Sequence, residues 1–150
     1  MFKRYVFIII ASFFSVSVLA QNPDIIVTGA TSIQNLDPCT ETHANLTVRN
    51  VSNDTLNILC EKIHINTTTG TSNYFCWGAN CYSSTTFISS SYNTLNPGEA
   101  DNVDFGGYYD AFCTSAIAVV EYCFYPENDS LNRTCITITY NGSSTSIASE

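Results

Sequence analysis

Seven cysteines are the residues with the most evident chemistry, and their number and spacing indicate disulfide bonds. The chain of 150 residues has no Cys-x-x-Cys pair and no His-x-x-x-His pair, the spacings that a zinc site usually provides. So many thiols in a short chain are typical of an oxidising compartment, and the odd number leaves one thiol unpaired. We therefore expect disulfides, with no resident metal and no cofactor. The cysteines are Cys39, Cys60, Cys76, Cys81, Cys113, Cys123 and Cys135.

Catalytic constellations find little support in the sequence. The two histidines, His43 and His64, stand apart, and no Gly-x-Ser-x-Gly elbow is present. Three carboxylates, Asp101, Asp104 and Asp110, offer oxygen ligands for calcium, but their spacing matches no EF-hand loop. A solvated acidic loop is the favoured interpretation, and we expect a protein that is not an enzyme.

The segment from Phe75 to Tyr82 combines two cysteines with aromatic side chains. Cys76 and Cys81 flank a glycine-containing turn, so we expect a disulfide that closes a small ring and contributes about 2 kcal/mol. The loop is a candidate aromatic platform for a sugar ring or a partner protein. The alternative is that Trp77 packs inward as a core residue, the more frequent role of aromatic side chains. The candidate recognition residues are Tyr74, Trp77, Tyr82, Tyr108 and Tyr109.

Alternating or β-branched apolar runs predict strands, and no stretch sustains a helical period. Residues that favour turns separate the runs at Gly70, Asn96–Gly98, Phe105–Gly107 and Pro126–Asp129. The pattern predicts an antiparallel β-sandwich of about seven strands with immunoglobulin-like topology. The predicted strands are Ile25–Val27, Ala44–Val48, Leu56–Ile65, Asn73–Trp77, Thr85–Ser89, Ala116–Tyr125 and Cys135–Tyr140.

The last two predicted strands can be placed in register. Pairing them around Asp129 aligns Cys123 with Cys135 on the outer face, where a cross-strand disulfide is geometrically allowed. The residues expected to face the core are Val120, Tyr122, Phe124, Ile136, Ile138 and Tyr140.

The N-terminus has the pattern of a cleaved export signal. Lys3 and Arg4 precede an apolar stretch, Tyr5–Val18, and small residues lead up to a cleavage point after Ala20. We expect a signal peptide over 1–20, a sandwich over 21–141, and a flexible tail over 142–150 without a membrane span in the mature chain. All 13 acidic residues follow the signal, and this charge disfavours nucleic acid as a partner.

Several motifs together resemble a known kind of module. They are Asn73-Tyr74-Phe75-Cys76-Trp77-Gly78, Cys81-Tyr82, Asn96-Pro97-Gly98, Phe105-Gly106-Gly107-Tyr108, Tyr122-Cys123-Phe124 and Asp129-Ser130. Over about Ala44 to Tyr140 the chain is similar to a domain of secreted Bacteroidota proteins that use the type IX secretion system. The resemblance implies an immunoglobulin-like module, accessory to a larger surface protein in which a C-terminal sorting domain follows.

An immunoglobulin-like order also places two further cysteines. Its second and sixth strands run in the same direction, so Cys39 and Cys113, each just before one of them, can meet at one end of the sandwich. That pairing would leave Cys60 as the free thiol.

These observations lead to two functional hypotheses. The first is an exported, non-catalytic module for adhesion or protein assembly at or near the bacterial cell surface, with a surface or secreted protein as its partner; a periplasmic location stays open. Exposed strand edges would support pairing with a neighbour. The alternative is a carbohydrate-binding module that uses the aromatic loop around Trp77 to bind a polysaccharide.

Overall fold

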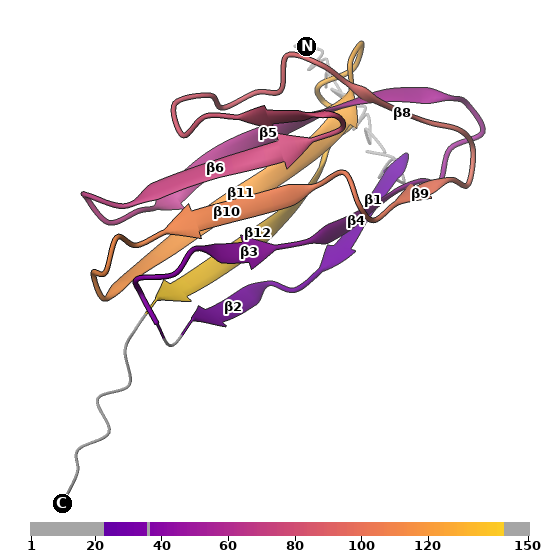
Figure 1. Cartoon of the computed structure of the whole chain (residues 1–150). Coiled ribbons are helices and arrows are strands. Elements are labelled where there is room, and N and C mark those ends of the chain that lie inside the picture. Colours follow the sequence, from indigo (N-terminus) through magenta and orange to yellow (C-terminus); the bar gives the residue numbers. More distant parts are fainter. Residues whose placement is uncertain (1–22, 36, 143–150) are drawn as a thin grey trace, which may run out of the picture.

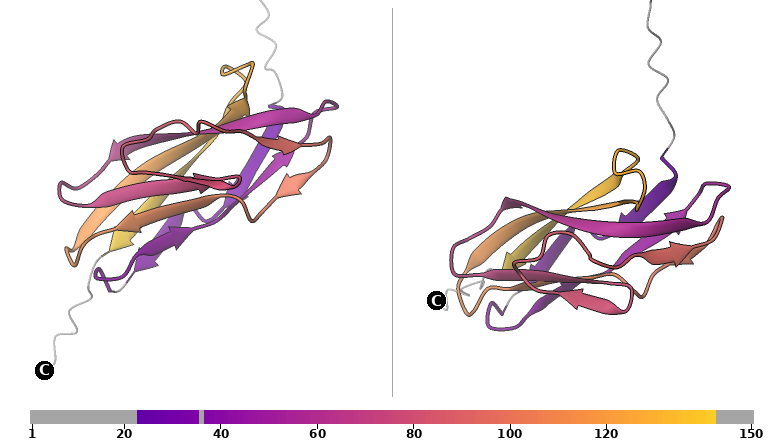
Figure 2. Two further views of the ribbon diagram at one scale, coloured as in Figure 1. Left: turned by 45° about the horizontal axis from the view of Figure 1, so that its top comes forward. Right: turned by 90° about the horizontal axis from the view of Figure 1, so that it is seen from above.

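A computed structural model describes residues 23–35 and 37–142 of the chain, which form strands in two facing layers (Figures 1 and 2). The expected leader over 1–20 and residues 143–150 of the expected tail lie outside the described residues. No helix within the described ranges is long and apolar enough to cross a membrane. The strands are β1 (Ile25–Gly29), β2 (Ser32–Asn35), β3 (Thr42–Ala44), β4 (Leu46–Asn50), β5 (Leu56–Asn66), β6 (Ser72–Trp77), β7 (Asn80–Tyr82), β8 (Asn93–Leu95), β9 (Ala100–Asp101), β10 (Gly106–Asp110), β11 (Ala116–Pro126) and β12 (Thr134–Gly142).

One layer is the five-stranded sheet β2-β12-β11-β5-β8, and the other combines the sheets β3-β10-β6-β7 and β1-β4-β9 (Figure 1). Every strand pair is antiparallel except β2 with β12, which is parallel. The chain therefore crosses between the layers from β1 to β2. This arrangement confirms the predicted antiparallel all-β sandwich.

Aromatic rings from both layers fill the space between them. The ring of Trp77 on β6 meets Phe124 on β11 edge to face at 5.1 Å between centroids, and Tyr109 on β10 lies 5.6 Å from Tyr140 on β12. Phe75 is also fully buried. Burial of several aromatic side chains is a large hydrophobic stabilisation for a chain of this size.

Polar cross-links join the layers beneath β6. The Trp77 indole Nε1 donates to the Ile58 carbonyl at 2.7 Å, and the buried Lys62 Nζ donates to the carbonyls of Asn73 and Ser84 at 2.7 and 3.0 Å. The side chain of Asn73 donates in turn to the hydroxyl of Tyr122 at 3.0 Å. These hydrogen bonds fix β6 on the other sheet, although the buried Oδ1 of Asn73 has no hydrogen-bond partner among the described residues.

The final two long strands confirm the predicted register. Cys123 lies opposite Cys135, and five of the six expected core residues are fully buried, whereas Ile136 is only partly buried against the core. Asn141 and Gly142 belong to β12, where they pair with Ile117 and Ala116, so the sandwich extends one residue beyond the expected boundary at 141.

Three sequence predictions about elements are wrong. The segment Ala44–Val48 is not one strand, because Ala44 ends β3 and Leu46 begins β4 in a different sheet. The segment Thr85–Ser89 is not a strand but a loop along β5, with a single bridge from Ile88 to Glu61. The predicted turn at Phe105–Gly107 lies instead in the sheet, where Gly106 and Gly107 begin β10. A glycine pair indicates a turn locally, but here both glycines serve close packing. The short strands β2, β7, β8 and β9 were not predicted, because two to four residues carry too little alternation.

The two glycines of β10 make room for tyrosines on opposite sides of the strand. A Cβ at Gly107 would meet the hydroxyls of Tyr140 and Tyr122 in the core, and a Cβ at Gly106 would lie 2.7 Å from Cε2 of Tyr108 on the outer side. Glycine has no Cβ and therefore permits both close approaches.

We predict different stability effects for alanine at these neighbouring positions. Gly107→Ala should lower the free energy of unfolding by about 1–3 kcal/mol, because the buried hydroxyl pair has little room to move. Gly106→Ala should change it by less than about 1 kcal/mol, because the closest contacts are side-chain atoms of the half-buried Tyr108 on the outer face, which can shift away. Urea unfolding of both variants measures the difference, and equal losses would contradict this account.

Lys62 gives a second prediction, for the pH dependence of stability. Burial lowers the pKa of Lys62 from 10.5 to about 8, so between these values the unfolded chain holds a proton that the folded chain has released. Stability contributed by this group therefore rises with pH across that window. Urea unfolding of wild type and Lys62→Met at about pH 7 and about pH 9 should show the wild type gaining stability relative to the variant. A constant difference would contradict the buried lysine.

Candidate binding face on the β3, β10 and β6 strands

Three rings form a row across the outer face of the sheet. His43 on β3 lies opposite Tyr108 on β10, which lies opposite Tyr74 on β6. Their neighbours along each strand are buried, so the alternation of a strand directs these three side chains outward. The rings of His43 and Tyr108 stack with centroids 4.4 Å apart and 12° between planes, and those of Tyr108 and Tyr74 at 4.6 Å and 4°.

Gly106 sets the position of the central ring. Because the space beside this residue holds no Cβ, the Tyr108 ring lies along β10 with its Cε2 and hydroxyl over the glycine. Within the described chain, the ring contacts of the stack end at His43 on one side and at Tyr74 on the other. Only the two terminal rings therefore have a ring face that is not covered by another ring of the stack.

Two carboxylates adjoin the stack. The Tyr74 hydroxyl donates to Glu41 Oε1 at 3.1 Å, and Asp110 lies two residues beyond Tyr108 on the same face of β10. Partial removal from water and then the hydrogen bond to Glu41 raise the pKa of Tyr74. Within the described residues, the one ion pair joins Arg133 to Glu61, so neither of these carboxylates has a cationic partner there.

The described chain has three disulfides, which match the pairs expected from the sequence; the first two join segments of the sheet that carries this face, and the third joins β11 to β12 in the other layer. They are Cys39–Cys113, Cys76–Cys81 and Cys123–Cys135. The first joins the segment before β3 to the loop after β10, close to Glu41 and Asp110 in the sequence. The remaining thiol is Cys60, which is completely buried. Burial raises its pKa well above the usual value, which makes it an unreactive core residue.

The structure divides the expected recognition residues. Trp77, Tyr82 and Tyr109 are 1%, 8% and 1% exposed, so they are core residues and the interpretation of Trp77 as an exposed platform is wrong. A Trp77→Ala variant would therefore report on folding and not on recognition. Tyr74 and Tyr108 are half-buried on the outer face, where they share the stack with His43.

Sequence reasoning did not identify His43 as a member of this site. Its position opposite Tyr108 becomes visible only when β10 is recognised as a strand. The double glycine concealed that strand, and a lone histidine carries little signal of its own.

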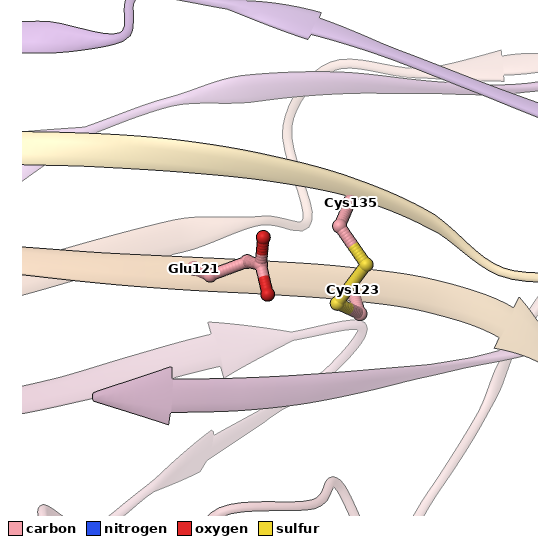
Figure 3. A group of neighbouring side chains, drawn as sticks. All are labelled: Glu121, Cys123 and Cys135. Atoms are coloured by element: carbon pink, nitrogen blue, oxygen red, sulfur yellow. A yellow bond between two sulfur atoms is a disulfide. The ribbon is translucent and has the colours of Figure 1, made fainter. Parts of the chain in front are cut away.

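Two groups of potential metal ligands are engaged in other bonds. Glu121, Cys123 and Cys135 have ligand atoms within 4.8 Å of one another, but both sulfur atoms belong to one disulfide and offer no thiolate (Figure 3). Among the acidic residues considered for calcium, Asp101 and Asp104 share the Asn93 amide, and their mutual hydrogen bond raises the pKa of Asp104. Asp110 is engaged elsewhere, because its Oδ1 accepts the Phe112 N–H at 2.8 Å.

Comparison with known proteins identifies the fold. No protein-family model and no curated protein matches the sequence. The structure is similar to a PapD-like domain of human CEP192, with a TM-score of 0.51 and 10% identity over 91% of this chain and 96% of that one. The N-terminal domain of PorA is similar with a TM-score of 0.51 and 8% identity over 80% and 98% of the two chains.

A third similarity covers only part of a larger protein. The secreted serine protease VesC from Vibrio cholerae has a TM-score of 0.51 and 12% identity over 79% of this chain but 23% of its own. At these identities the likeness concerns the fold alone. The chain therefore has an immunoglobulin-like, PapD-like β-sandwich fold.

Proposed function

We propose that this chain is an exported, non-catalytic immunoglobulin-like module that binds a protein partner through the outer face of β3, β10 and β6. The observation that carries the proposal is the stack of His43, Tyr108 and Tyr74 beside two carboxylates without cationic partners in the described chain. Half-exposed tyrosines on a rigid sheet supply contact area at low entropic cost, a property of protein-binding surfaces. Adhesion or assembly at or near a bacterial cell surface is the role that we assign to it.

The arrangement of the rings favours a protein over a polysaccharide. A sugar packs its C–H groups on an open aromatic face, whereas here the near-parallel rings cover one another. Most of the accessible area is ring edge, hydroxyl and imidazole, which suits the hydrogen bonds of a polypeptide. Carbohydrate binding is therefore the weaker candidate.

Strand pairing at a sheet edge is also less favoured than side-chain contact. Of the six edge strands in the described chain, β2, β3, β7, β8 and β9 have two to four residues and β1 has five. The loop at Phe87 and Ser89 bonds to the backbone of Lys62 and Cys60 along β5. Short or covered edges are how sheets avoid strand addition. The partner is thus expected on the face and not on an edge.

Export is the remaining part of the proposal. Three disulfides in the described chain fit an oxidising compartment, as does the signal-peptide pattern in the sequence. Delivery by the type IX system stays a proposal that rests on the motif resemblance.

Photo-crosslinking from the proposed face tests this function. Benzoylphenylalanine in place of Ser72, which lies opposite Asp110 on the sheet, should yield a discrete adduct with another protein in the native cell. The matched control replaces Thr137, an exposed residue on β12 in the other layer. Tyr108→Ala in the Ser72 background should reduce the adduct at least about fivefold, because it removes the centre of the stack.

The same experiment separates the alternatives. Equal adducts from both positions, or none from Ser72, would contradict the proposed face. Retention of the chain on an insoluble polysaccharide that is lost in Tyr74→Ala would favour the carbohydrate alternative.

A further inference from the structure

The chain has few basic residues to balance its acidic ones. The chain carries 13 acidic residues against five basic ones, and two of the basic residues belong to the expected leader. Of the three basic residues in the described chain, Lys62 is buried, Arg133 is paired with Glu61, and Arg49 on β4 is exposed. The net negative charge of the chain would therefore attract a partner that supplies positive charge.

One arginine of this chain already contacts a tyrosine ring and a glutamate together. The guanidinium of Arg133 lies 5.3 Å from the centre of the Tyr125 ring, and its Nη1 is 2.9 Å from Glu61 Oε2. One arginine thus contacts a tyrosine face and a glutamate at once. Both contacts are favourable for a planar guanidinium, which stacks on rings and donates in a fixed fork.

The end of the ring stack presents the same pair of groups without an arginine. Tyr74 is the terminal ring, and its hydroxyl holds Glu41 beside it at 3.1 Å. Glu41 is exposed, and its Oε2 has no hydrogen bond to another described residue. Asp110, two residues beyond Tyr108 on the central strand β10 and opposite Ser72 on β6, adds a second carboxylate beside the stack.

We infer that this end of the face is a binding site for an arginine side chain of the partner, which packs on Tyr74 and pairs with Glu41. The inference rests on the proposed function and names the chemistry of its partner. Arginine fits better than lysine, because an ammonium offers no planar surface to the ring and no bidentate fork to the carboxylate.

Titration of a labelled peptide tests the inference. The probe is a fluorescein-labelled peptide of Arg-Gly-Ser repeats, measured by fluorescence anisotropy against the folded chain with its disulfides intact. Glu41→Gln should weaken binding about tenfold, because a neutral amide loses the charge-assisted hydrogen bonds. The matched control Glu127→Gln changes an exposed glutamate after β11 and should leave affinity within about twofold.

Chemical variants of the probe complete the design. A peptide with citrulline for arginine keeps the shape and loses the charge, so it should not bind measurably, and a lysine peptide should bind more weakly. Equal weakening by both glutamate variants, no binding of the arginine peptide, or equal affinity for citrulline would each overturn the inference.

Failure of this inference can be told apart from failure of the proposed function. A crosslinked partner that binds Glu41→Gln as well as wild type would refute the arginine site while the protein-binding face remains. Absence of any adduct from position 72 would refute the face itself.

Discussion

Two adjacent residues without a side chain, Gly106 and Gly107, are the constraint on which the arrangement depends. On the inner side, Gly107 lets the hydroxyls of Tyr122 and Tyr140 meet at 3.2 Å directly beneath the sheet. Burial raises the pKa of both phenols, that of Tyr122 to about 12, so they remain neutral hydrogen-bonding groups. On the outer side, Gly106 lets Tyr108 lie down between its neighbours. The Gly106-Gly107 dipeptide therefore determines both the packing of the core tyrosines and the position of the ring stack on the surface.

The stack is useful for binding because the strands under it are fixed. The Asn73 amide bonds both to the Tyr108 carbonyl at 2.7 Å and to the Tyr122 hydroxyl at 3.0 Å, which ties β6 to β10 and to the opposite layer. Lys62 and the disulfides add further cross-links around the same strands. Side chains that are already ordered lose little conformational entropy when a partner binds. A rigid row of rings is therefore a better recognition surface than a mobile loop.

The alternation of apolar and polar residues predicted those parts of the fold in which a residue's type depends on whether its side chain is buried. Alternation in β11 and β12 was enough to align Cys123 with Cys135, and the parity that buries Phe75 also buries Trp77. The site depended on contacts that the sequence does not display. Gly106 and Gly107 have the sequence signature of a turn. A glycine can be required either for an unusual φ angle or because there is no room for a Cβ, and the sequence alone does not distinguish these reasons. The partner of each ring follows from strand pairing, which requires the whole topology.

The most direct test of the binding face is to map where a cationic ligand contacts the protein in solution. NMR chemical shifts of the backbone amides and aromatic rings would be followed during titration with the Arg-Gly-Ser peptide. The largest changes should fall on Tyr74, Tyr108 and His43 and on the amides around Glu41. Changes centred on the acidic loop at Asp101 and Asp104, or spread evenly over all carboxylates, would contradict the proposed face.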